Sequence, residues 1–169
     1  MDLDKLAQIV DDMAVQHEYP GYEIRSLKMG LPLEVTKAPA KLFTAALKHE
    51  NALVRLAGLR WFWERPGVAK QYTRLIAESI NDTDEWVRME SIRVIERISD
   101  VDEQIAIQIA DKLTDVDVEV RKAAAKALGK LGSKAQQVID LLRKASEDSD
   151  HEVRWKAQKA LRQLGAYVA

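Results

Sequence analysis

The dipeptide Val-Arg recurs four times at a constant spacing of 33 residues, and this recurrence constrains the fold more than any other feature of the chain. The copies stand at Val54-Arg55, Val87-Arg88, Val120-Arg121 and Val153-Arg154. Each Val is preceded at three residues by Asn51, Asp84, Asp117 or Asp150, and at five residues by His49, Asp82, Asp115 or Asp148. A fixed period of 20–50 residues is typical of stacked repeats that share one continuous core.

Each repeat contains two helical patterns joined by the acidic turn. In the first pattern, apolar pairs four residues apart recur in register, and Leu142 continues the series Phe43/Leu47, Ile76/Ile80 and Ile109/Leu113. In the second pattern, an apolar stripe of period 3.6 predicts a core that includes Leu128. The helix starts are predicted by the N-caps Asp117 and Asp150 and by the capping boxes Ser133/Gln136 and Asp100/Glu103. The helix ends are predicted by Gly132 and Gly165.

The consensus D-x-D-x-x-VR-x-x-A-x-x-ALG-x-LG resembles the HEAT repeat, in particular its short phycobilisome-lyase HEAT-like variety, over about residues 38–165. The resemblance implies an all-α, right-handed α-α superhelix whose second helices line the concave face. It also implies a ladder of hydrogen bonds between neighbouring repeats. Its rungs would join Asp84, Asp117 and Asp150 to Arg55, Arg88, Arg121 and Arg154, and Asn51 would weaken the first rung.

The N-terminal part of the chain matches the repeat less well. Residues 3–15 form an amphipathic helical pattern, and residues 21–31 are a candidate shortened second helix in which Ile24-Arg25 replaces Val-Arg. We therefore expect one continuous solenoid of about five helical hairpins. Residues 1–37 would form a degenerate capping unit and linker, and residues 38–169 four regular repeats, because the terminal repeats of a solenoid are atypical.

Composition excludes several classes of function. The chain has 169 residues, no cysteine and a net charge of −1, so disulfides, thiolate metal sites and cysteine nucleophiles are excluded. It lacks a signal-peptide pattern and a run of about 20 apolar residues, so we expect a cytoplasmic protein without a membrane partner. No catalytic or phosphate-binding motif is present, and His17, His49 and His151 differ in repeat position. We expect no metal, no cofactor and no enzyme activity.

A basic row occupies one position of every regular repeat. On a helical wheel, Arg60, Arg93, Lys126 and Lys159 lie opposite the core positions. The segments 120–132 and 153–164, which belong to the last two second helices, carry further bases such as Lys122 and no acid. Solvated helix faces would explain these charges, but a positive inner face would also attract an anionic partner.

Apolar side chains fall on the same side of the wheel, where solvent is expected. They are Leu56, Leu59, Trp63, Met89 and Ile92, and Trp155 also points outward, whereas Trp61 points into the core. A contiguous exposed apolar patch often marks an interface. Two alternatives compete with an interface: the linker residues Leu31, Leu33 and Val35 cover the patch, or the helix register is rotated in the first repeats.

These observations favour a non-catalytic scaffold that binds a protein or peptide, with an acidic partner as the natural complement. The expected contacts are Leu56, Leu59, Arg60, Trp63, Met89, Arg93, Lys122, Lys126, Trp155 and Lys159. One alternative is nucleic-acid binding through the basic row. It includes an alkyl-base DNA glycosylase, whose catalytic Asp would have to be replaced by Glu96. Another alternative, which follows from the family resemblance, is a bilin lyase or chromophore-handling accessory protein.

Overall fold

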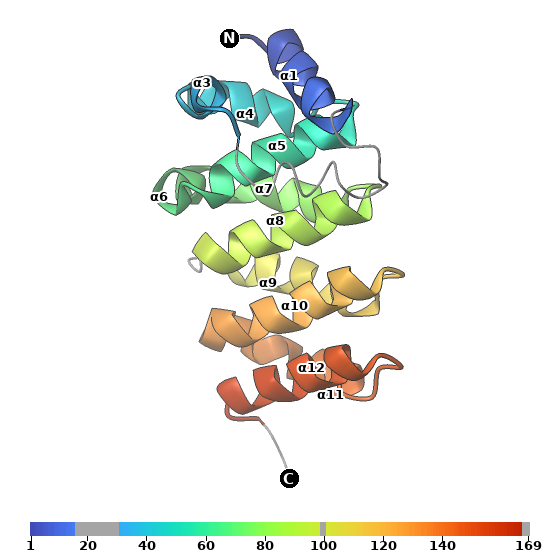
Figure 1. The fold of residues 1–169 in the computed structure, drawn as a ribbon. Coiled ribbons are helices and arrows are strands. Elements are labelled where there is room, and N and C mark those ends of the chain that lie inside the picture. The colour runs from blue at the N-terminus through green and yellow to red at the C-terminus, as the bar shows by residue number, and fades with distance from the viewer. Residues whose placement is uncertain (16–30, 99–100, 167–169) are drawn as a thin grey trace.

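The chain folds into helical hairpins stacked one upon another (Figure 1). The structure is a computed structural model, and it describes residues 1–15, 31–98 and 101–166. The hairpins are α4 (Ala40–Ala46) with α5 (Ala52–Trp63), α7 (Thr73–Glu78) with α8 (Glu85–Ile98), α9 (Glu103–Asp111) with α10 (Val118–Leu131), and α11 (Ile139–Ala145) with α12 (His151–Gln163). Shorter elements are α3 (Leu33–Thr36), α6 (Pro66–Ala69) and the 3-10 turns Lys70–Tyr72, Ser79–Asn81, Lys112–Thr114 and Gly132–Val138. The expected all-α superhelix is confirmed.

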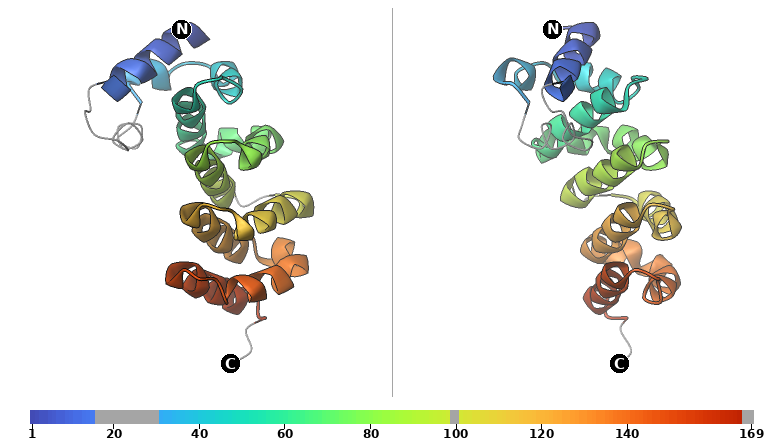
Figure 2. Two further views of the ribbon diagram at one scale, coloured as in Figure 1. Left: turned by 90° about the vertical axis from the view of Figure 1, so that its right-hand side faces the viewer. Right: turned by 45° about the vertical axis from the view of Figure 1, so that its right-hand side comes forward.

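The second helices form one layer of the stack. Figure 2 shows α5, α8, α10 and α12, which we call the inner layer, on one side and the first helices on the other. Each inner helix packs against its own hairpin partner and against the next inner helix, so α5 contacts α8, α8 contacts α10, and α10 contacts α12. An inner helix between two others is therefore covered on three sides.

The N-terminal end is covered by α1 (Leu3–Val15), which packs on α4 and α5. Its Leu6 and Val10 are buried, so the apolar side of this amphipathic helix faces the core. Ile24-Arg25, the candidate replacement for Val-Arg, lies outside the described residues. Among the helices that the structure describes, none is long and apolar enough to cross a membrane.

The turn aspartates cap the inner helices as the sequence predicts. Asp117 accepts hydrogen bonds from the backbone of Glu119 and Val120, and Asp150 accepts the equivalent pair from Glu152 and Val153. Helix α10 ends before Gly132, whose φ of 59° is accessible to glycine without strain. The Ser133 prediction is wrong, because a 3-10 turn occupies this segment and α11 begins only at Ile139. Asp100 lies outside the described residues, and Asp102 caps α9.

The ladder between repeats exists, but it uses other aspartates than those that the family resemblance implies. The rungs use the first acid of each turn: Arg55 Nη2 donates to Asp82 Oδ1 at 2.7 Å. Arg88 donates to Asp115 at 2.9 and 2.8 Å, and Arg121 donates to Asp148 at 2.9 and 3.1 Å. The assignment to the second acids is wrong, because Asp84, Asp117 and Asp150 are engaged in capping and only the first acid faces the preceding repeat.

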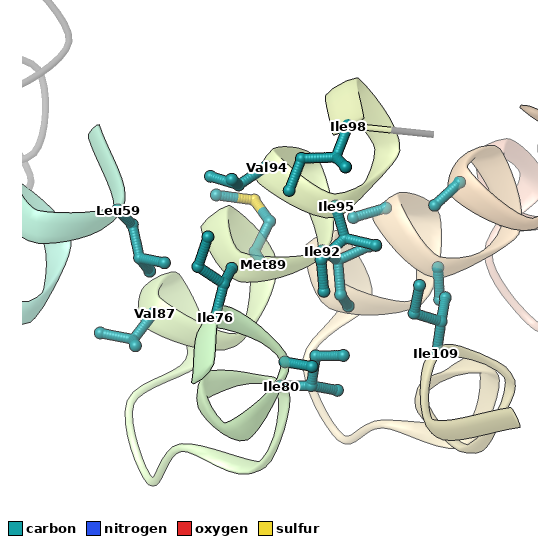
Figure 3. Packing of buried hydrophobic residues seen from close by; sticks show 14 of the residues in the cluster. Leu59, Ile76, Ile80, Val87, Met89, Ile92, Val94, Ile95, Ile98 and Ile109 are labelled. Atoms are coloured by element: carbon teal, nitrogen blue, oxygen red, sulfur yellow. The ribbon is translucent and has the colours of Figure 1, made fainter. Parts of the chain in front are cut away.

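The apolar residues predicted to face solvent are buried, so this prediction is wrong for four of the five. The exposed fractions are 4% for Leu56, 0% for Leu59, 1% for Met89 and 0% for Ile92. Figure 3 shows Leu59, Met89 and Ile92 among the other buried apolar side chains. Leu56, Leu59 and Met89 therefore offer no surface to a partner in this structure.

The neighbouring inner helix explains this burial. Lys122 occupies in its repeat the position of Leu56 and Met89, and it contacts Glu152 of the next inner helix at 3.1 Å. Gly129 occupies the position of Trp63, and a Cβ there would lie 2.9 Å from the Ala160 Cα of the next inner helix. The wheel treats everything opposite the first helix as free surface, although a solenoid covers part of it with the following repeat. Of the linker residues, Leu31 and Val35 are buried and Leu33 is 70% exposed.

Candidate binding surface

The basic row lies on the inner layer, and it becomes more exposed toward the C-terminus. The side chain of Arg60 is 23% exposed, that of Arg93 37% and that of Lys126 53%, and Lys159 is exposed as well. The four residues lie one on each inner helix, and Lys126 and Lys159 of the last two line one pocket.

Acids neutralise most of the row. Arg60 Nε lies 3.0 Å from Glu64, Arg93 Nη1 lies 2.7 Å from Glu90, and Lys126 Nζ lies 3.1 Å from Glu96. These acids sit on α8 or at the end of α5, outside the acid-free segments of the last two inner helices. The prediction of a positive inner face is therefore wrong for the first two regular repeats, where Arg60 and Arg93 are paired with acids.

Glu96 is the buried acid of this surface, at 6% exposed. Its carboxylate pairs with both Lys126 and Lys130 of α10. One carboxylate cannot neutralise two ammonium groups, so this cluster keeps a net positive charge. The same pairing occupies the carboxylate that the glycosylase alternative would need as a catalytic acid.

Trp63 and Lys122, two other expected contacts, are already engaged. The guanidinium groups of Arg60 and Arg97 lie over the Trp63 ring, with their Cζ atoms 4.7 and 4.5 Å from its centroid. Lys122 is only 13% exposed in its side chain and contacts Glu119 at 2.9 Å and Glu152 at 3.1 Å. The hydrogen bond from Lys122 to Glu119, together with that to Glu152, raises the pKa of the Lys122 ammonium. A partner would have to displace these contacts.

Among residues 1–15, 31–98 and 101–166, Trp155 is the large aromatic side chain that is exposed, at 53%. It lies on α12 beneath the ammonium groups of Lys156 and Lys159, whose Nζ atoms are 5.5 and 5.1 Å from the ring centroid. Together with Lys126, Lys130 and Gln163 these residues line a pocket of about 260 Å³. We call it the lysine–tryptophan pocket, and none of its lining residues is an acid.

The sequence identified half of this pocket. Lys126, Trp155 and Lys159 were expected contacts, whereas Lys130, Lys156 and Gln163 were not. Lys130 and Lys156 belong to the acid-free segments, but they occupy other wheel positions than the basic row. Only the distance between α10 and α12, set by the close approach at Gly129, brings the two sets of lysines to one pocket.

The two histidines that the structure describes, His49 and His151, lie in different repeats. His49 Nδ1 accepts a hydrogen bond from the backbone of Asn51 at 3.1 Å, which stabilises the first turn. His151 is exposed at the start of α12, and His17 lies outside the described residues. Within residues 1–15, 31–98 and 101–166, no group of three or more His, Asp or Glu side chains is arranged to hold a metal ion.

Comparison with protein families matches residues 104–169 to HEAT repeats. Comparison with the curated proteins finds no match. Among solved structures, an engineered protein is similar with a TM-score of 0.62 and 20% identity, over 87% of this chain and 68% of that one.

Two further solved structures have the same fold. The complex of CpcE and CpcF of phycocyanin lyase from Nostoc sp. PCC7120 matches with a TM-score of 0.56 and 23% identity, over 75% of this chain and 78% of that one. A designed armadillo repeat protein in complex with the peptide (KR)4 matches with a TM-score of 0.61 and 15% identity, over 96% and 91%. At these identities the likeness concerns the fold.

Proposed function

Because the chain is a HEAT-like repeat protein, we propose that it is a non-catalytic scaffold that binds an acidic peptide segment of a partner protein in the lysine–tryptophan pocket. The observation that carries this proposal is Trp155, which is half exposed between four lysines on the inner layer. An accessible Trp is a frequent binding anchor, and buried contact with its ring contributes much of the affinity of an interface.

The charge of the pocket sets the sign of the ligand. Glu96 compensates one of the four lysine charges, and Glu152 lies 4.0 Å from Lys156. Lys159 has its ammonium over Trp155 and no acid partner in the described part of the chain. The designed armadillo repeat protein binds a basic peptide, whereas the lysines of this pocket complement Asp and Glu side chains.

A nucleic-acid ligand fits the same surface less well. Binders of single strands combine a positive groove along the backbone with several aromatic rings that stack successive bases. Here Trp155 is one such ring and Trp63 is covered by two arginines. The basic-row residues outside the pocket, Arg60 and Arg93, are paired with acids. The likeness to CpcE and CpcF concerns the fold, and no residue of the pocket distinguishes a bilin from other anions.

The proposal is tested with a fluorescein-labelled octapeptide of alternating Asp and Glu, (Asp-Glu)4, whose binding is measured by fluorescence anisotropy. Trp155→Ala and the double reversal Lys126→Glu/Lys159→Glu should each weaken binding about tenfold or more. The matched control Lys41→Glu/Lys144→Glu changes the net charge equally at exposed positions outside the pocket and should weaken binding less than about threefold.

Two results would overturn the proposal. If pocket and control variants lose affinity equally, the peptide senses only the overall charge and the pocket is not its site. If an eight-nucleotide oligothymidylate binds more tightly than the peptide and its affinity falls steeply with salt, the nucleic-acid alternative replaces the proposal. Capture from native lysate, with and without nuclease, then identifies the natural ligand.

A further inference from the structure

The ladder arginines Arg88 and Arg121 share one arrangement, and Arg55 differs from it in that Nη2 donates to Asp82 while Nε is unpaired in the described structure. One edge of each guanidinium is anchored to its own turn: Arg88 Nη1 donates to the carbonyls of Asp82 and Thr83, both at 3.0 Å. The other edge holds the carboxylate of the next repeat, at 2.9 Å from Nε and 2.8 Å from Nη2. Arg121 repeats both halves with Asp148 as the carboxylate. Each turn thus orients an arginine toward an acid beyond it.

Arg154, in the last repeat, has only the first half of this arrangement. Its Nη1 donates to the carbonyls of Asp148 and Ser149, both at 2.8 Å. No carboxylate contacts its other edge in the part of the chain that the structure describes. Arg154 is thus held in the orientation in which its equivalents bind a carboxylate, so little conformational entropy remains to be lost on binding.

We infer that the open edge of Arg154 is a second binding site, which takes an Asp or Glu side chain of the acidic partner proposed above. Three equivalent arginines hold carboxylates in the same structure, and a planar guanidinium pairs bidentately with a carboxylate. This inference rests on the proposed function for the identity of the partner and adds a specific contact to it.

The position of Arg154 links it to the lysine–tryptophan pocket. Arg154 and Trp155 are consecutive on α12, and a helix turns by about 100° per residue, so the two side chains leave adjoining sides of that helix. In Figure 1, α12 is the last inner helix of the stack. A peptide anchored at Trp155 reaches Arg154 by crossing one exposed helix, and eight extended residues span about 26 Å.

The surface between the two side chains favours a polar ligand over another packed repeat. Gln158 occupies the position at which the preceding repeats carry the buried side chains of Leu59, Ile92 and Ala125. A stacking repeat would bury the polar amide of Gln158, whereas an extended acidic segment leaves it hydrated.

The contact is tested with the labelled (Asp-Glu)4 peptide and three variants. Arg154→Gln should weaken binding about tenfold, since a hydrogen-bonded charged pair is lost. Arg154→Lys should recover only part of this loss, because an ammonium lacks the paired donors. Arg143→Gln removes an equal charge from α11, where Arg143 pairs with the exposed Asp140, and should change affinity less than about twofold.

A second measurement avoids any effect of the substitutions on folding. In the wild-type protein, the Nε–H resonance of Arg154 should shift on titration with (Asp-Glu)4, because that group would donate to the carboxylate. If Arg154→Gln matches Arg143→Gln and the resonance stays in place while Trp155→Ala still weakens binding, the inference fails and the proposed function stands. If Trp155→Ala has no effect while Arg154 responds, the inference stands and the pocket proposal fails.

Discussion

Arg88 and Asp115 join two successive repeats through paired hydrogen bonds of 2.9 and 2.8 Å, and both side chains are at most 10% exposed. The residues are separated by the rest of one inner helix, the following first helix and its turn. Because Arg88 also bonds two carbonyls of its own turn, the rung fixes the position of one turn relative to the next. The ladder is thus a structural device that holds neighbouring repeats in place, and its last arginine is left open to a partner's acid.

Asp115→Asn should destabilise the protein by about 3–5 kcal/mol, because it leaves the buried guanidinium of Arg88 without its counter-charge. Urea denaturation at pH 7 measures the free energy of unfolding. Asp140→Asn is the matched control: its carboxylate is 86% exposed and pairs with Arg143, so the loss should stay below about 1 kcal/mol. Equal losses would show that the rung contributes no more than a surface pair.

The ladder also predicts a loss of stability in acid. Desolvation raises the pKa of the Asp115 carboxyl, but the hydrogen bonds from Arg88 and from the backbone of Asp117 outweigh it, so the net pKa is lowered. Desolvation opposes the same kinds of hydrogen bond at Asp148, with the same net direction. A carboxyl whose pKa is lowered by folding stabilises the folded state above its unfolded pKa of about 3.9, and this stability is lost as the pH falls through the folded pKa.

Urea midpoints followed from pH 6 down to pH 2 should therefore fall most steeply below about pH 4. Asp115→Asn/Asp148→Asn should start from a lower stability at pH 6 and decline less, because both titrating groups are gone. Parallel declines in the wild type and the double variant would show that these carboxyls do not carry the acid sensitivity.

Gly129→Ala should destabilise the protein by about 1–3 kcal/mol, although alanine is the better helix former. A Cβ at this position would meet Ala160 Cα at 2.9 Å and the Gln163 side chain, so α12 would have to move away from α10. Gly67→Ala is the control, because a Cβ there has no neighbour within 4 Å. In thermal unfolding, the midpoint temperature of Gly129→Ala should lie below that of the wild type and far below that of Gly67→Ala. The midpoint of Gly67→Ala should not fall below that of the wild type.

Leu128→Ala should cost about 2–5 kcal/mol as a truncation of a fully buried side chain. The measurement is the shift of the urea midpoint at constant slope. A loss below about 1 kcal/mol would mean that Leu128 does not belong to the core shared by the stacked hairpins.

The sequence predicted the hairpins because their determinants are local. Asp117 and Asp150 cap the helices that they precede. The apolar period predicts Leu128 in the core and Trp155 outside it, and their exposed fractions are 0% and 53%. It could not distinguish the two acids of each turn, because Asp115 and Asp117 are equally suited to a cap by residue type. Their roles separate only when the next repeat is stacked in place and Arg88 reaches the first of them.

The candidate binding surface was predictable only in part, for the same reason. A helical wheel describes one helix, and the burial of Leu59 and Met89 comes from neighbouring helices of the inner layer. The neutralisation of Lys126 by Glu96 also crosses from one repeat to the next. The wheel predicted correctly that Trp155 is exposed. In the described structure no other inner helix packs on that side of α12, so a description of the single helix is sufficient there.

The most direct test of the proposed site is to follow the indole N–H resonances of the four tryptophans during titration with unlabelled (Asp-Glu)4. The Trp155 resonance, assigned by its loss in Trp155→Phe, should shift and saturate with the peptide. The resonance of Trp61, which is 4% exposed and donates to the Thr36 carbonyl at 3.2 Å, should stay in place. A saturating shift of another indole with none at Trp155, or no shift at all at peptide concentrations that saturate binding, would contradict a partner site at the lysine–tryptophan pocket.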